Sequence, residues 1–322
     1  MINWLDIEGR YSLPCVATPR DLGSRGKSSA ALTEWVEGNL GFVTEKLQTH
    51  GAVLFRGFSF EGIEDFDKFA NVFCPVRQDY IGGNSPRTKV KGEVYTATEY
   101  PNSAKISLHN EASYLRNMPR KILFYCAAPP KDRGQTPLAD CRKVLQKIDP
   151  SVRERFARKG IKYLSNLHGG CGFGRSWQDV FQTEDQGQVE RWLKMSGYEY
   201  SWKVGGGLQT SIVGEAVMKH PETKEDVWVN QAEQWHPSSL DPKARNALLS
   251  LLKKEEEFPH NAYFGDGAPL TEPDLEHIRQ VLAEQEVVFK WTEKDVLLCD
   301  NYLVAHGRQP FTGERKVLVA FG

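Results

Sequence analysis

The sequence predicts a mainly β protein with inserted helices, built on a double-stranded β-helix (jelly-roll) core. Two observations support this fold class. Short apolar segments with strand character lie toward both ends of the chain, and segments with helical spacing lie between them. A length of 322 residues allows one large domain or two ordinary ones. Because no repeat, linker or low-complexity tract divides the chain, we expect residues 1–322 to form a single elaborated domain.

The first third of the chain alternates helical and extended patterns. Apolar residues recur at threes and fours in residues 28–47 and 63–73, which predicts two helices. Residues 52–55 between them form a short apolar run and are a candidate buried strand. Residues 80–104 are rich in Gly, Asn, Ser, Pro and Thr, which predicts a long loop or lid with short strands.

The remaining chain gives further candidate elements. Extended patterns occupy residues 106–111, 121–127, 295–300 and 316–321, and residues 134–140 form a turn that leads into a strand. Helical patterns occupy residues 141–158, 187–195, 241–257 and 272–285. Residues 165–176 are polar and glycine-rich, which predicts a flexible insert.

Composition narrows the class of protein. The net charge is -1, so the overall charge favours neither a nucleic-acid partner nor an anionic membrane. The six cysteines form no Cys-x-x-Cys pair, which argues against zinc-ribbon and thioredoxin-like sites. The start of the chain lacks a basic region followed by an apolar stretch, and no apolar run reaches the ~20 residues of a membrane helix. We therefore expect a cytoplasmic protein with reduced cysteines.

Two histidines and a glutamate form the most informative pattern. His109 and Glu111 lie in Ser-Leu-His-Asn-Glu, and His306 lies in Val-Ala-His-Gly-Arg. Two imidazoles and one carboxylate are the ligand set of a mononuclear non-haem iron centre with open positions. Alternate residues of a strand point to one face, so one strand could present both His109 and Glu111. A His-x-Glu pair alone is weak, because it more often marks an ordinary histidine beside an acid.

An arginine further along strengthens the pattern. Arg315 opens the last apolar strand, and a guanidinium fork is suited to bidentate capture of a carboxylate. Taken alone, Arg315 would be read as one half of a surface ion pair.

The whole pattern resembles the Fe(II)/2-oxoglutarate-dependent dioxygenases of the taurine dioxygenase superfamily. Within it, the branch that includes clavaminate synthase and the syringomycin-biosynthesis aspartyl hydroxylase is the most similar. The resemblance rests on His-Gly-Ala-Val-Leu-Phe-Arg-Gly-Phe (50–58), Leu-His-Asn-Glu-Ala-Ser-Tyr (108–114), Gly-Gln-Thr-Pro-Leu-Ala-Asp (134–140), Tyr-Phe-Gly-Asp-Gly (263–267) and the run from 300 to 315.

The resemblance implies a role for five residues. His109, Glu111 and His306 match the iron ligands, while Arg315 and Thr136 match the residues that bind the distal carboxylate of 2-oxoglutarate. Most of the superfamily has aspartate at the position of Glu111, but this branch commonly has glutamate. Related halogenases have a small residue there, so Glu111 argues against halogenation.

The implied reaction uses Fe(II), 2-oxoglutarate and O2. It would oxidise an unactivated C–H of an amino acid or an amino-acid-derived group, free or tethered to a carrier protein, in natural-product biosynthesis. Hydroxylation, desaturation and cyclisation all remain open, as does the oligomeric state. Asn84, Tyr114 and Asn230 are candidate substrate contacts, although each could instead be a turn, core or capping residue. Arg87 and Arg308 could meet a substrate carboxylate.

Two other classes compete with the oxygenase. A non-catalytic jelly-roll binding protein could keep the fold, but it would have no physical need for all five residues. A zinc hydrolase could use two histidines and a glutamate. That set usually appears as His-Glu-x-x-His on a helix, and the sequence has no such motif.

Overall fold

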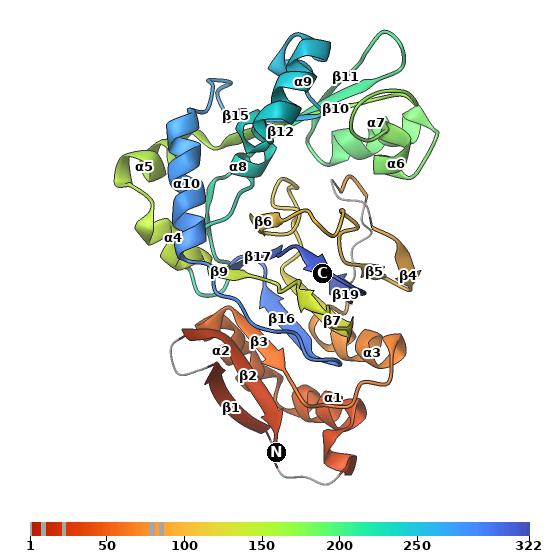
Figure 1. Cartoon of the computed structure of the whole chain (residues 1–322), viewed down its shortest axis with the longest axis vertical. Helices are drawn as coiled ribbons and strands as arrows, with labels where there is room; N and C mark the ends of the chain where they lie inside the picture. The colour runs from red at the N-terminus through yellow and green to blue at the C-terminus, as the bar shows by residue number, and fades with distance from the viewer. Residues whose placement is uncertain (1, 8–10, 21–23, 77–80, 84–86) are drawn as a thin grey trace.

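The computed structural model describes residues 2–7, 11–20, 24–76, 81–83 and 87–322. It contains both helices and strands, with most strands arranged in sheets (Figure 1). None of the helices in this part of the chain has the length and apolar character needed to cross a membrane. Asn84, one candidate substrate contact, lies outside the described residues.

An eight-stranded sheet forms the centre of the fold. Its order is β1 (Ile2–Ile7), β2 (Tyr11–Pro19), β3 (Ala52–Phe55), β16 (Val296–Asp300), β7 (Lys121–Ala128), β19 (Lys316–Phe321), β5 (Val94–Thr96) and β4 (Lys89–Lys91). Only β2 and β3 pair in parallel, and the other neighbours are antiparallel. The sheet therefore joins the two ends of the sequence, as the apolar segments there predicted.

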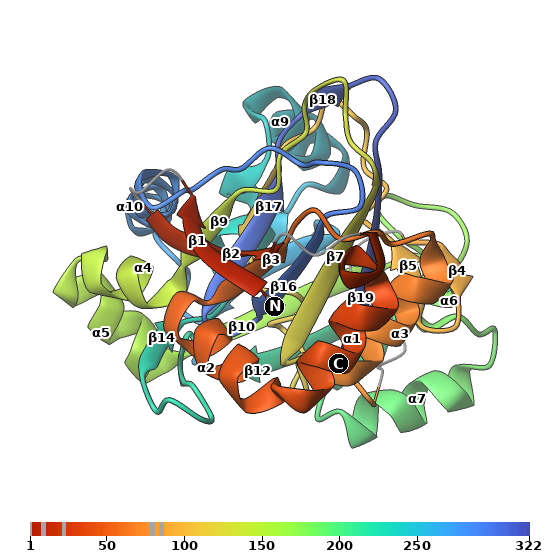
Figure 2. The same ribbon diagram turned by 90° about the horizontal axis from the view of Figure 1, so that it is seen from below.

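The two faces of this sheet bury alternate residues, as the pleat requires. On one face, side chains such as Phe55, Leu123 and Leu298 pack against α1 (Ser29–Gly38), α2 (Leu40–His50) and α3 (Ile63–Phe73). Figure 2 shows these three helices covering that face. The opposite face, which includes Leu54, Phe124 and Leu297, belongs to the second and larger core.

A three-stranded sheet shares that larger core. It consists of β6 (Ile106–His109), β17 (Val304–Arg308) and β9 (Leu138–Asp140), with β17 in the middle. Leu108, Leu138 and Val304 pack with the residues of the large sheet. The space between the two sheets is where the candidate metal ligands lie.

The middle of the chain forms a separate layer, far from α1–α3 in Figure 1. Its sheet has the order β11 (Glu199–Trp202), β12 (Leu208–Gly214), β10 (Ile161–Leu167) and β15 (His260–Phe264).

Two small ribbons pair β13 (Val217–Lys219) with β14 (Asp226–Trp228), and β8 (Asp132–Arg133) with β18 (Phe311–Thr312).

Helices surround this layer and connect it to the sheets below. They are α4 (Cys141–Lys147), α5 (Pro150–Lys159), α6 (Trp177–Phe181), α7 (Gln186–Met195), α8 (Ala232–Trp235), α9 (Pro242–Leu252) and α10 (Glu272–Glu284), with 3-10 turns at Ser24–Lys27, Pro237–Ser239 and Glu255–Glu257.

The structure corrects two predicted helices. Residues 28–47 form two helices because Asn39 leaves the helical region with φ −130°, and its amide donates to the carbonyl of Trp35. Residues 141–158 also divide, because the carboxylate of Asp149 caps a new helix that has Pro150 at its start. The predicted flexible insert at 165–176 begins inside β10, which extends to Leu167.

Candidate metal centre and co-substrate pocket

Two neighbouring strands bring the candidate histidine ligands together. His109 ends β6, and His306 lies directly opposite it on β17 in the antiparallel register. Their ring centroids are 4.5 Å apart, and Phe124 of the large sheet packs edge-on against His306 at 5.0 Å. One strand pair thus brings together His109 and His306, which are far apart in the sequence, as the hypothesis of a shared site requires.

Glu111 lies beyond the strand, which corrects the expectation that one strand carries both His109 and Glu111. β6 ends at His109, and Glu111 lies in the following turn, where Ala112 has φ 52°. The turn is held by Asn301, a residue with no solvent exposure. Its side-chain oxygen accepts from the Glu111 N–H at 2.8 Å, and its amide donates to the Glu111 carbonyl at 2.9 Å.

Asn301 therefore links the two halves of the centre. Its amide also donates to the carbonyl of Pro119 at 2.8 Å, and its own carbonyl accepts from the amide of Asn110 at 2.7 Å. Asn301 lies in the turn between β16 and β17, just before the strand that carries His306. From the sequence, this residue was noted only within the run from 300 to 315.

The three side chains form a set that suits a divalent metal. One ligand atom from each of His109, Glu111 and His306 lies within 4.8 Å of the other two. The Nδ1 of His109 is 2.9 Å from the carbonyl of Ser107. Since a carbonyl only accepts, Nδ1 carries the proton and Nε2 keeps its lone pair for a metal. The Nε2 of His306 is 3.8 Å from Glu111 Oε2.

Burial keeps both imidazoles in the neutral form that binds metals. Loss of solvation lowers the pKa of His109, although the nearby Glu111 carboxylate acts in the opposite direction. Burial lowers the pKa of His306 well below its usual value, and His109 adds to this effect. Neutral imidazole is the ligand form, so proton competition for these nitrogens is weak near neutral pH.

A buried arginine balances the glutamate charge. Nη2 of Arg87 is 2.5 Å from Oε2 of Glu111, and the side chains of Arg87 and Glu111 are only 3% and 4% exposed. The guanidinium also lies over the ring of Phe321. A carboxylate this deeply buried needs a cation beside it, and in this structure Arg87 fills that role.

The candidate 2-oxoglutarate residues line the same pocket as the histidines. His109, Thr136, His306 and Arg315 all line a cavity with about 380 Å³ of empty space, including its mouth. Arg315 donates from Nε to the Gly134 carbonyl at 3.0 Å and from Nη2 to the Thr136 hydroxyl at 3.4 Å. Its Nη1 donates to none of the described residues.

Thr136 is poised to donate a hydrogen bond. Its hydroxyl oxygen accepts from the indole N–H of Trp291 at 3.0 Å as well as from Arg315. Two incoming donors leave the hydroxyl hydrogen free for an acceptor such as a carboxylate. Burial lowers the pKa of Arg315 to about 10, which still leaves it cationic at neutral pH. Trp291 was not singled out from the sequence.

The other candidate residues have different surroundings. Tyr114 is buried and packs against Trp235 with ring centroids 5.0 Å apart. Asn230 donates to the carbonyl of Ala216 and accepts from the N–H of Ala232. These two bonds leave one amide hydrogen and one oxygen lone pair of Asn230 for a further partner, and a substrate contact stays a prediction.

Arg308 lines the same pocket, and a neighbouring loop engages both of its Nη atoms. Its Nη1 donates to the carbonyls of Thr98 and Tyr100, and its Nη2 donates to those of Pro101 and Ala104. Four carbonyls therefore occupy the guanidinium, which fixes the 98–104 loop beside the pocket. The Nε of Arg308 is buried and has no hydrogen-bond partner among the described residues, so a contact between Arg308 and a substrate carboxylate stays a prediction.

A second group of possible ligands, His220, Glu222 and Asp300, is explained without a metal. Nδ1 of His220 accepts from the N–H of Thr223 at 2.9 Å, so Nε2 carries the proton and donates to Asp300 at 3.1 Å. No lone pair remains on the imidazole for an ion. Asp300 also accepts from the N–H groups of Tyr302 and Leu303, so the group stabilises the turn before β17.

Comparison with known proteins identifies the family. Residues 17–321 match the model of the "Taurine catabolism dioxygenase TauD, TfdA family". The chain belongs to this family. Its members depend on Fe(II), 2-oxoglutarate and O2, which agrees with the predicted chemistry, and the chain is an oxidoreductase of this class. The resemblance drawn from the sequence motifs is confirmed.

Two curated relatives align with most of the chain. The dapdiamide synthesis protein DdaC of Enterobacter agglomerans is 38% identical over 86% of this chain and 84% of its own length. A clavaminate synthase-like protein of Arabidopsis thaliana is 31% identical over 89% of this chain and 86% of its own length.

A solved structure supports the fold. PvcB, described as an Fe, alpha-ketoglutarate dependent oxygenase from an isonitrile synthetic pathway, superposes with a TM-score of 0.55 at 16% identity. The match covers 100% of this chain and 90% of PvcB.

Proposed function

We propose that His109, Glu111 and His306 hold Fe(II), and that Arg315 and Thr136 hold the distal carboxylate of 2-oxoglutarate. One observation carries this assignment: two of the three ligands line the same pocket as the arginine and the threonine. We further propose that the large sheet and the three-stranded sheet form the two halves of a jelly-roll core in one domain. Their shared apolar core supports this.

Each residue has a task in this reaction. When bound, iron with 2-oxoglutarate and O2 supplies an oxidant that removes hydrogen from an unactivated C–H. The two neutral imidazoles and the carboxylate would hold the metal as three of its ligands. Arg315 and Thr136 orient the co-substrate through charge-assisted and hydroxyl hydrogen bonds. The surrounding apolar residues, including Phe124, keep water away from the reacting C–H.

The substrate is an amino acid or an amino-acid-derived group, free or carrier-bound, in a natural-product pathway. The likeness of the metal and co-substrate segments to the clavaminate synthase branch supports this class, as does the relative named for dapdiamide synthesis. For hydroxylation, the net reaction combines R–H, 2-oxoglutarate and O2 into R–OH, succinate and CO2; desaturation and cyclisation are the alternatives. Tyr114, Asn230 and Asn84 remain proposed substrate contacts.

The assignment can be tested by succinate formation in metal-free protein. Adding Fe(II) should restore 2-oxoglutarate turnover, whereas Zn(II) should not, because zinc has no redox chemistry. His109→Ala should abolish turnover, and His277→Ala, a change on α10 outside the pocket, should leave it intact. Turnover with zinc, or retained turnover in His109→Ala, would contradict the ligand assignment.

A further inference from the structure

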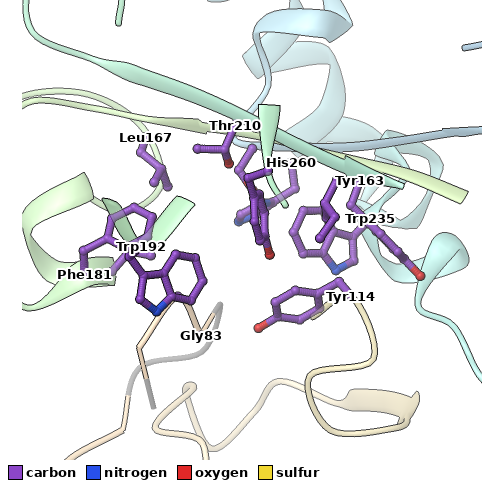
Figure 3. A pocket seen from close by; sticks show the side chains of 14 residues that line it. Gly83, Tyr114, Tyr163, Leu167, Phe181, Trp192, Thr210, Trp235 and His260 are labelled. Atoms are coloured by element: carbon purple, nitrogen blue, oxygen red, sulfur yellow. The ribbon is translucent and has the colours of Figure 1, made fainter. Parts of the chain in front are cut away.

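A second cavity lies in the layer formed by the middle of the chain. It lies between the sheet that contains β10, β12 and β15 and helices α6 and α7, and it contains about 430 Å³ of empty space, including its mouth. Figure 3 shows the rings of Tyr114, Tyr163, Trp192 and Trp235 arranged around it, with Phe181 at one side. Tyr114, Tyr163 and Trp235 pack with one another at centroid distances of 5.0 to 6.2 Å.

The described residues that line this cavity carry no charge. Among them there is no lysine, arginine, aspartate or glutamate. His260, which lines it, has a pKa lowered to about 4 by burial, with the charge of Arg175 as a smaller cause. It is therefore neutral at physiological pH. The charged side chains Arg116 and Arg158 line a different, neighbouring cleft.

An uncharged lining decides which ligand group fits. A carboxylate would be buried without a cation, and the desolvation of an ammonium would outweigh its attraction to the aromatic faces. A flat, uncharged group would bury apolar area against the rings without either penalty.

The wall also offers a hydrogen-bond donor without a partner. The indole nitrogen of Trp235 is buried and has no hydrogen-bond partner among the described residues. Trp235 as a whole is only 7% exposed. In Figure 3 this nitrogen lies on the edge of the ring that faces Tyr114. A buried N–H of this kind favours a ligand with an acceptor such as an amide carbonyl.

The cavity is close to the iron ligands in the chain. Tyr114 lines it and lies on the same turn as Glu111. The segment between these two residues can span at most about 11 Å even when fully extended. A substrate that extends about this far from the metal centre would reach Tyr114 in the wall of the cavity.

We propose that this cavity binds the distal part of the substrate, and that this part is an uncharged aryl or amide group. The inference rests on the proposed function, since the cavity extends that substrate site. It predicts an N-acylated or otherwise amide-extended amino acid rather than a short free one.

The first test uses three fragments that share one ring. Benzamide is neutral, benzoate is anionic and benzylamine is cationic at pH 7. Each fragment is titrated calorimetrically into the full chain loaded anaerobically with Fe(II) and 2-oxoglutarate. Benzamide should bind at least tenfold more tightly than either charged fragment. Equal binding of the three fragments would overturn the assigned chemistry.

Variants then locate the binding. Thr210→Trp should fill the cavity and weaken benzamide at least tenfold, while the isosteric Thr210→Val should change its affinity less than twofold. Trp235→Phe keeps the ring and removes the N–H, so it should weaken benzamide about three- to tenfold. If Thr210→Trp does not fold, the benzamide affinity of Trp235→Phe alone tests the proposal. Unchanged benzamide affinity in the folded variants would overturn the proposal.

The last test connects the cavity to the metal centre. N-benzoyl amino acids should shift the visible band of the Fe(II)–2-oxoglutarate complex at concentrations at least tenfold lower than the free amino acids. Thr210→Trp should remove that difference. Absence of the band in wild type would contradict the proposed function itself. A band that responds equally to both ligand series would contradict only the cavity inference.

Discussion

Replacing Asn301 tests how the fold positions Glu111. The side chain has no solvent exposure and makes three hydrogen bonds, one from the Glu111 N–H and two to the carbonyls of Glu111 and Pro119. Asn301→Asp preserves the shape and the acceptor oxygen. It replaces the donating amide with an oxygen that faces two carbonyl oxygens.

The expected cost follows from these contacts. Each buried hydrogen bond contributes about 1 kcal/mol net, and an unsatisfied buried partner costs about 1–3 kcal/mol. Asn301→Asp leaves two carbonyls unpaired and adds repulsion, so we expect a loss of about 3 kcal/mol or more in unfolding free energy. Because Glu111 then loses its support, Fe(II) affinity should fall by roughly 10–100-fold.

Urea unfolding and Fe(II) titration measure the two effects separately. Asn39→Asp is the matched control, because Asn39 is exposed and its side chain donates only to the carbonyl of Trp35. It should change stability by less than about 0.5 kcal/mol. An Asn301→Asp protein with wild-type stability and iron affinity would refute the positioning role of Asn301.

Three further predictions concern charged residues. Arg315→Ala should weaken the binding of 2-oxoglutarate at least about tenfold, because charge-assisted hydrogen bonds are lost. Arg315→Lys should recover only part of this affinity. Unchanged affinity in a binding titration would assign Arg315 a structural role. Arg87→Gln should lower the melting temperature of the metal-free protein, since Glu111 loses its buried partner. Fe(II) should then raise the melting temperature of the variant more than that of the wild type. An equal increase in the two proteins would contradict this prediction. Burial raises the pKa of Glu233 from 4.5 to about 7. The folded state therefore holds this proton more tightly, and about 3 kcal/mol of stability is lost as pH rises from about 4.5 through 7. Glu233→Gln should remove that part of the pH dependence in urea titrations at several pH values, and an unchanged profile would contradict it.

Strand segments and ligand types were accessible from the sequence because local patterns specify them. The apolar runs at 52–55, 121–127 and 316–321 appear as β3, β7 and β19 of one sheet. The pairing of His109 with His306 was not visible, because register between distant strands depends on tertiary packing.

Interactions made through backbone groups were the least predictable. Glu111 lies outside the strand because Asn301 hydrogen-bonds its backbone N–H and carbonyl. The alternation of residues along a strand does not predict these bonds. Four loop carbonyls accept hydrogen bonds from the two Nη atoms of Arg308, which the sequence offered only as a candidate anion ligand. Partners of this kind come from segments with no periodic signal, so only the folded structure reveals them.

The most direct test of the proposed centre is an anaerobic titration of Fe(II) and 2-oxoglutarate into metal-free protein. The assignment of His109, Glu111 and His306 with Arg315 predicts a weak visible charge-transfer band that saturates at one equivalent of iron. That band should be absent in His306→Ala. A folded wild-type protein that shows no band, or a band unchanged in His306→Ala, would contradict the assignment.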